Sequence, residues 1–137
     1  MTTTAWAHLP NAALIDRVLA DVKRRPDAWD AAWKVYQPEA WEAWTDAWLA
    51  AGMAKSRWYD GRAAVDAAWK AVWDTVGDWV HDEAREAARG AILALATWDD
   101  ACLLLIVPVP ALRLYAANGS HAAVLMLPAA IALGETA

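Results

Sequence analysis

The pentapeptide "DAAWK" occurs at residues 30–34 and again at residues 66–70. In a helix, the Asp and Lys of each copy are one turn apart and can pair on the exposed face. The Trp of each copy then points elsewhere with alanines beside it, and a large side chain facing small ones lets helices interdigitate. The repeat therefore predicts amphipathic helices that pack through tryptophan ridges and alanine grooves.

Composition extends this expectation to the whole chain. Alanine, the strongest helix former, supplies 35 of the 137 residues, whereas Gly and Pro number six each. We therefore expect an all-α, single-domain bundle of five to seven helices over residues 1–137, with a long central helix and short apolar C-terminal helices. The segment "CLLLIV" at 102–107 is the one place where a strand stays open, because it is short, apolar and partly β-branched.

Local signals predict where the helices begin and end. Asn11 has the chemistry of an N-cap, and Pro26 ends the first helix. Pro38 breaks or kinks a second helix that begins near Asp27. A helical pattern from residue 62 to residue 91 predicts the long central helix, with Gly77 or Gly90 as the place of a bend. Four more boundaries are expected from cap chemistry and proline. Thr97 and Asp100 have the form of a capping box, and Pro110 is expected as a first helical residue. Asn118-Gly119 is expected to end that helix, and Ser120 to cap a last segment that Pro128 interrupts.

Charge divides the chain into two parts. Residues 1–89 hold 25 of the 29 charged side chains, and residues 90–137 hold only four. We expect charged amphipathic helices over 1–89 and an apolar, largely buried segment over 90–137. The uncharged stretches 101–112 and 120–134 are too short or too interrupted by proline to cross a bilayer as simple helices. The N-terminal residues lack the pattern of a secretory signal, so we expect a cytoplasmic protein without a membrane partner.

Several chemistries are not expected. A net charge of −5 argues against nucleic acid, whose binding needs clustered Lys and Arg. The single Cys102 excludes an intrachain disulfide and favours a small buried side chain over a nucleophile. Asp78 and His81 have the i, i+3 spacing of helical metal ligands, yet no second copy exists. No P-loop, HExxH, GxSxG or GxGxxG occurs. We expect neither an enzyme nor a bound metal or cofactor.

Eleven tryptophans and no phenylalanine form the most unusual feature of the composition. Core packing is the simplest explanation, yet each buried indole N–H needs an acceptor, and so many donors are hard to satisfy in one small core. A partner-binding surface, a cage for a cation or sugar, and a platform for nucleic-acid bases are the alternatives. The candidate interaction surface comprises Trp29, Trp33, Trp41, Trp44, Trp48 and Trp58.

Three charged residues in the apolar part of the chain form a candidate buried polar cluster. Asp99 and Asp100 stand between two apolar runs, and Arg113 is the obvious counter-charge for either. One interpretation places both carboxylates at a helix N-terminus, where they meet free N–H groups and the helix dipole. The other makes them an acid/base pair, one with a raised pKa, in a small-molecule binder or hydrolase.

The stretches "AILALATWDDACLLL" and "LRLYAANGSHAAVLMLPAAIAL" resemble a module in uncharacterised Ala/Trp-rich helical proteins of actinobacteria and their phages. The resemblance covers residues 62–133. An alanine stands here between Asp100 and Cys102, where the module has the Cys directly after the acids. The matching residues are Asp99, Asp100, Cys102, Leu112, Ala116, Gly119 and Leu127-Pro128-Ala129. The resemblance implies a high-GC bacterial or phage origin and cytoplasmic residence, with no known activity.

Together these observations favour a non-enzymatic helical protein-interaction module. The resemblance implies that it is phage- or prophage-encoded, and the excess of Trp predicts that it binds a host protein or associates with itself as an oligomer. A peripheral membrane protein that inserts its apolar C-terminal region is one alternative, although its polar face lacks the usual basic residues. A small-molecule binder or hydrolase centred on Asp99 and Asp100 is the other.

Overall fold

The structure is a computed structural model that describes residues 6–7, 9–55, 59–75 and 81–134. These residues form six α-helices and one 3-10 helix, and they contain no strand. The elements are α1 (Ala12–Arg24), α2 (Pro26–Lys55), α3 (Tyr59–Thr75), α4 (Asp82–Thr97), η2 (Asp99–Leu105), α5 (Val109–Ala117) and α6 (His121–Gly134). The predicted all-α, single-domain bundle is confirmed, and "CLLLIV" begins inside a 3-10 helix.

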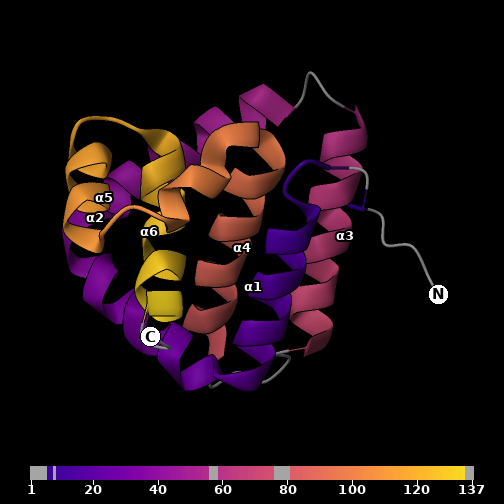
Figure 1. The fold of residues 1–137 in the computed structure, drawn as a ribbon, viewed down its shortest axis with the longest axis horizontal. Helices are drawn as coiled ribbons and strands as arrows, with labels where there is room; N and C mark the ends of the chain where they lie inside the picture. Colours follow the sequence, from indigo (N-terminus) through magenta and orange to yellow (C-terminus); the bar gives the residue numbers. More distant parts are fainter. Residues whose placement is uncertain (1–5, 8, 56–58, 76–80, 135–137) are drawn as a thin grey trace.

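Two helices, α4 and α6, form the middle of the bundle. Figure 1 shows α5, α6, α4, α1 and α3 following one another across the view, with α2 passing behind α5 and α6. The long helix α2 packs against both α4 and α6, which also pack against each other. The helices α1 and α3 contact α4, and α5 contacts α6. Most other elements therefore lie against one of these two helices.

The sequences of α4 and α6 explain their central position. All residues from 123 to 130 on α6 are buried, and the helix carries no Asp, Glu, Lys or Arg. On α4 every residue from 90 to 95 is buried, and three small residues of the preceding turns are buried too. A helix that is apolar on all sides must be covered on all sides. These buried residues of α4 are Ala84, Ala87, Ala88, Gly90, Ala91, Ile92, Leu93, Ala94 and Leu95.

A close approach between α2 and α4 occurs where Trp44 meets Gly90. A Cβ atom added to Gly90 would lie 2.1 Å from Cη2 of Trp44, so only glycine leaves room for this ring. Trp44 also makes an edge-to-face contact with Trp33, with ring centroids 4.7 Å apart. Tyr36 packs against both indoles from the same helix. This aromatic cluster joins the first half of α2 to α4.

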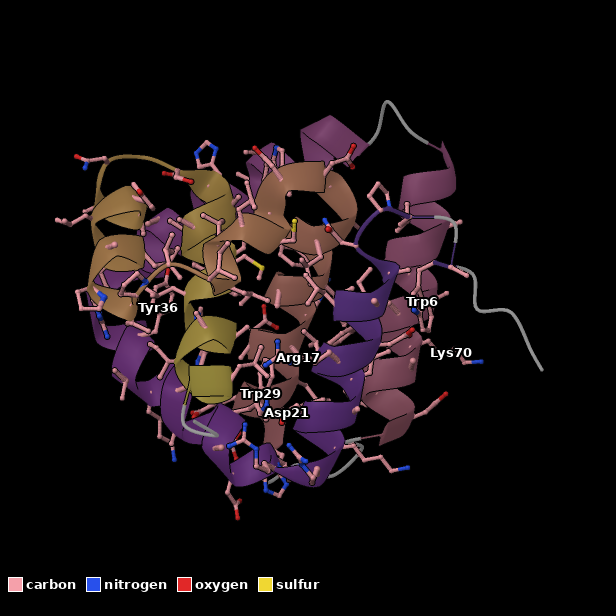
Figure 2. All side chains as sticks on the ribbon, in the orientation of Figure 1. Trp6, Arg17, Asp21, Trp29, Tyr36 and Lys70 are labelled. Atoms are coloured by element: carbon pink, nitrogen blue, oxygen red, sulfur yellow. The ribbon has the colours of Figure 1, made fainter. Side chains whose placement is uncertain are left out.

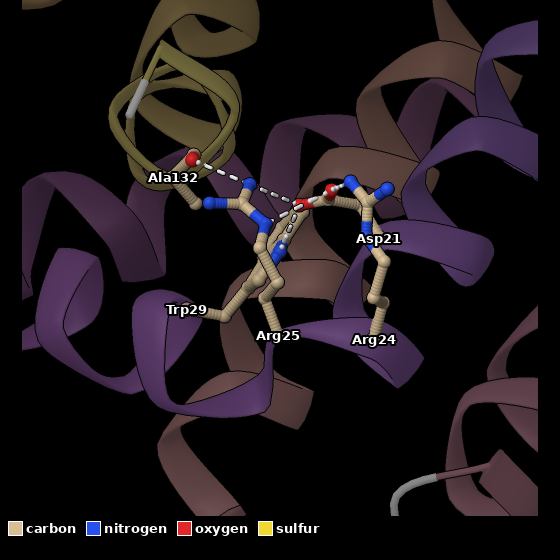
Figure 3. A network of polar contacts seen from close by, with 5 residues as sticks. All are labelled: Asp21, Arg24, Arg25, Trp29 and Ala132. Carbon is tan, nitrogen blue, oxygen red and sulfur yellow. Dashed lines mark hydrogen bonds and ion pairs between the residues drawn. The ribbon is translucent and has the colours of Figure 1, made fainter. Parts of the chain in front are cut away.

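A buried polar network fixes the corner between α1 and α2 (Figure 3). Asp21 is buried and accepts hydrogen bonds from Arg24 at 2.8 Å, Arg25 at 2.6 Å and the indole Nε1 of Trp29 at 2.9 Å. Arg25 also donates to the carbonyl oxygen of Ala132 in the last turn of α6 at 2.9 Å. Burial raises the pKa of Asp21, but the hydrogen bonds from Arg25, Trp29 and Arg24 outweigh it and hold the pKa below its ordinary value.

Asn11 precedes α1 as predicted, but its side chain does not cap that helix. Its Nδ2 donates instead to the carbonyl oxygens of Leu95, Trp98 and Asp99, at 2.9, 3.2 and 3.1 Å. These carbonyls belong to the end of α4 and the start of η2. Since the last four carbonyls of a helix lack partners within it, Asn11 supplies a donor to a helix end distant in sequence.

The boundaries near the C-terminus follow the sequence signals in part. Gly119 adopts a φ of +94°, and the amides of Gly119 and Ser120 donate to the carbonyls of Ala116 and Tyr115, which is a Schellman motif at the end of α5. The Ser120 hydroxyl accepts from the amide of Ala123 at 3.2 Å, so its predicted role as the cap of α6 is confirmed. The helix α5 begins at Val109, one residue before the predicted start at Pro110.

Three other boundary predictions are wrong. Thr97 is the last residue of α4 and gives no cap to η2, so the Thr97/Asp100 capping box does not form. The helical pattern over 62–91 belongs to α3 and α4, which are separate helices, and α4 begins after His81. The residues 76–80 between them lie outside the described part. Pro128 lies inside α6 without ending it, and α2 likewise continues through Pro38 as the longest described helix.

Candidate functional site

The predicted tryptophan surface is largely part of the core. Trp29, Trp33 and Trp44 are buried, so the prediction that they contact a partner is wrong. Trp48 is half-buried. The side chains of Trp41 and Trp58 lie outside the described residues. Core packing, the simplest explanation of the tryptophans, therefore holds for these three.

The indoles of α2 and α3 that remain partly exposed are stacked on arginines of α4. The guanidinium of Arg89 lies between Trp48 and Trp69, with its Cζ atom 4.1 and 4.6 Å from the two ring centroids. Arg85, which is buried, lies 4.3 Å from the centroid of Trp73 and pairs with Asp82. Indole faces attract cations because of their ring quadrupole. Here the cations come from the protein itself, so these stacked faces do not form an empty cage.

The predicted polar cluster of Asp99, Asp100 and Arg113 is not buried. Both aspartates are exposed in the first turn of η2, where their charges face the positive end of the helix dipole. Arg113 is half-buried on α5 and engaged in an interaction there. The prediction of a buried cluster is wrong, since both carboxylates are exposed. Asp100 lines a pocket together with His121, and the binder or hydrolase alternative centred on the two aspartates stays a prediction. Cys102 is half-buried, and its Sγ lies 3.6 Å from the carbonyl oxygen of Asp99.

A third group of polar side chains joins the start of α2 to the start of α4. His81 Nε2 lies 2.8 Å from Oδ1 of Asp27 and 3.8 Å from Oδ2 of Asp30. Asp30 Oδ1 accepts a hydrogen bond of 2.7 Å from the amide of Ala84. Since Ala84 lies in the first turn of α4, Asp30 caps that helix from a neighbouring one. These three side chains could hold a metal ion, but their contacts already account for their positions.

An apolar surface on η2 and α5 was missed at the level of sequence. Leu103 and Ile106 are 55% and 79% exposed, and Leu114 on α5 is 64% exposed. Tyr115 is also exposed. These four exposed residues are close together in the sequence, and we refer to them as the η2–α5 surface. The expectation that residues 90–137 are largely buried holds for α6 and the end of α4 but is wrong for this segment.

The lengths of the described helices bear on whether they could cross a membrane. None of them combines the length and the hydropathy that crossing a bilayer requires. The most apolar one, α6, has 14 residues and is therefore about 21 Å long, against about 30 Å of hydrocarbon.

Comparisons with known proteins give no relative for this chain. No protein-family model matches it, and neither a curated protein nor a solved structure is significantly similar to it. The resemblance to Ala/Trp-rich proteins of actinobacteria and phages therefore stays a prediction.

Proposed function

We propose that this protein is a non-enzymatic helical interaction module that associates through the η2–α5 surface. The observation that carries the proposal is the exposure of Leu103, Ile106 and Leu114 within twelve consecutive residues. Single exposed leucines are common, but several large apolar side chains in one short segment are typical of a protein-binding surface. A bacterial or phage origin and cytoplasmic residence belong to the same proposal.

We propose a second copy of the same chain as the occupant of this surface. The net charge of −5 opposes association between most pairs of surfaces. In a two-fold symmetric contact the same patch lies on both sides, so any charge in it faces its own sign. From Leu103 to Tyr115 the chain has one charged residue, Arg113. The η2–α5 surface can therefore meet its copy with little repulsion.

The test is the molar mass in solution, measured by light scattering over a range of protein concentrations. The wild-type chain is expected to reach the mass of a dimer as its concentration rises. Ile106→Glu places two like charges in the contact and is expected to raise the dissociation constant at least about tenfold. Leu49→Glu is the matched control, because Leu49 is 60% exposed on α2, outside the η2–α5 surface.

Two results would overturn this proposal. If the wild-type chain keeps the mass of a monomer at millimolar concentration, the proposal of self-association is refuted. If Ile106→Glu and Leu49→Glu raise the dissociation constant of the dimer equally, the contact between the two copies lies elsewhere or is unspecific. Flotation of the wild-type chain with liposomes, lost in Ile106→Glu, would assign the same surface to a membrane interface instead.

A further inference from the structure

A pocket of about 450 Å³ lies where α2, α5 and α6 meet. Its walls are mostly apolar and include Ala43, Leu114, Val124 and Leu127, while Tyr36 and Arg113 bring the polar groups. Figure 2 places Tyr36 beside α5, at the opposite end of the molecule from Lys70 on α3. An apolar cavity of this size with few polar groups is the usual form of a small-molecule site.

Tyr36 provides the second observation. Only 2% of this residue is exposed, and its hydroxyl has no hydrogen-bond partner in the described part of the chain. A buried hydroxyl without a partner is costly, and native structures rarely leave one unexplained. Burial raises the pKa of Tyr36 well above its ordinary value, so the hydroxyl stays protonated and can donate a hydrogen bond to an acceptor.

Arg113 provides the charge. Among the described residues that line this pocket, it is the only charged one. It already takes part in an interaction, but a guanidinium has five N–H donors and can bind two groups at once. Two donors of different kinds beside an apolar wall fit an acceptor that is negatively charged and attached to a hydrocarbon body.

We propose that this pocket binds an apolar carboxylate, such as a medium-chain fatty acid, with the carboxylate accepting from Tyr36 and Arg113 and the hydrocarbon lying against α5 and α6. The head group reaches the buried hydroxyl only if part of the wall moves. Leu114 lines the pocket and is 64% exposed, so its side chain is a part of the wall that has space to move. This site shares Leu114 with the proposed self-association surface, whereas Leu103 and Ile106 do not line it, so Ile106→Glu tests self-association without altering the pocket.

The test is calorimetric titration of the whole chain with octanoate and octylammonium below their micellar concentrations and with octanol below its solubility limit. Octanoate is expected to saturate one site per chain and to bind more tightly than the other two. Tyr36→Phe removes only the hydroxyl and keeps the ring against Trp33 and Trp44, so the variant remains folded. It is expected to weaken octanoate binding about tenfold or more, because a hydrogen bond to a charged group is lost.

Arg113→Gln is expected to weaken octanoate at least as much and to leave octanol unchanged. Arg17→Gln is the matched control, because it removes the same charge from an exposed position on α1 (Figure 2). The proposal is overturned if octanoate does not saturate, if octylammonium binds equally well, or if Tyr36→Phe retains wild-type affinity. Equal effects of Arg113→Gln and Arg17→Gln would also overturn it, since they would reflect net charge alone.

Discussion

Replacing Gly90 by alanine separates helix propensity from packing in one substitution. In an isolated helix this change is favourable by about 1 kcal/mol. In this bundle the new Cβ would lie 2.1 Å from Cη2 and 2.7 Å from Cζ2 of Trp44. These distances are far below a carbon–carbon contact of about 3.5 Å. Either the indole or the whole of α2 has to move.

The indole of Trp44 has little freedom to move. It is buried, and Trp33 and Tyr36 hold it with centroid separations of 4.7 and 5.8 Å. Overpacking a well-ordered core costs about 1–3 kcal/mol, and more where backbone has to shift. We take about 3 kcal/mol as the cost, so Gly90→Ala is expected to destabilise the chain by about 2 kcal/mol after the gain in propensity.

Urea unfolding followed by circular dichroism measures this difference, because it does not depend on the tryptophan environment. Gly134→Ala is the control, since a Cβ there meets nothing within 4 Å, and its effect should stay within a few tenths of a kcal/mol. Combining Gly90→Ala with Trp44→Leu should abolish the penalty of the alanine. Stabilisation by Gly90→Ala alone would refute the close approach of α2 and α4.

Substitutions at three further positions test polar groups of the bundle. Asp21→Asn breaks a buried ion pair and should cost about 3 kcal/mol at neutral pH. Because the folded chain lowers the pKa of Asp21, this stabilisation is present above the ordinary value of 3.8 and is lost as the pH falls through the folded value, so the variant and the wild type should converge in acid unfolding curves. A difference that stays constant from pH 6 to pH 3 contradicts this role. Tyr36→Phe should leave the ligand-free chain as stable or raise its stability by about 1 kcal/mol, and a clear loss in urea unfolding would reveal a partner of the hydroxyl. Ser120→Ala should cost about 1 kcal/mol and Ser120→Thr much less, since only the alanine removes the cap of α6.

The sequence was sufficient where structure depends on neighbouring residues. Alanine content predicted the fold class, and the signals at Pro26, Gly119 and Ser120 each placed a helix boundary correctly. A left-handed glycine or a capping hydroxyl acts on amides three to five residues away. Such contacts are present in any fold that contains the helix, so they can be predicted without the tertiary structure.

Other signals failed because a distant partner competed for the same group. Asn11 has the chemistry of an N-cap, yet carbonyls more than eighty residues away take its amide. Asp30, expected to pair with Lys34, caps α4 instead. A polar side chain can pair with any donor or acceptor that the fold brings within reach. Spacing in the sequence reveals only those that are near in the chain.

Lack of charge was a poor guide to burial for the candidate site. The segments 101–112 and 120–134 are both uncharged, yet α6 is buried between α2, α4 and α5 whereas much of η2 faces solvent. The difference lies in position, because α6 has neighbours on several sides. The pocket was also beyond prediction, since Tyr36 and Arg113 are far apart in the chain and line one pocket only because α2 and α5 both pack on α6.

The two "DAAWK" copies show how strongly position determines the use of one sequence. In the first copy Trp33 is buried in the aromatic cluster of α2. In the second copy Trp69 is half-buried and stacks on Arg89 of α4. Neither Lys34 nor Lys70 is ion-paired within the described residues, so the predicted outer pairs do not form there. The pentapeptide therefore builds a helix in both places, and the neighbouring helix decides whether its tryptophan fills the core or covers an arginine. Since most described tryptophans are used in one of these two ways, the apolar side chains of η2 and α5 carry the stronger argument for a partner.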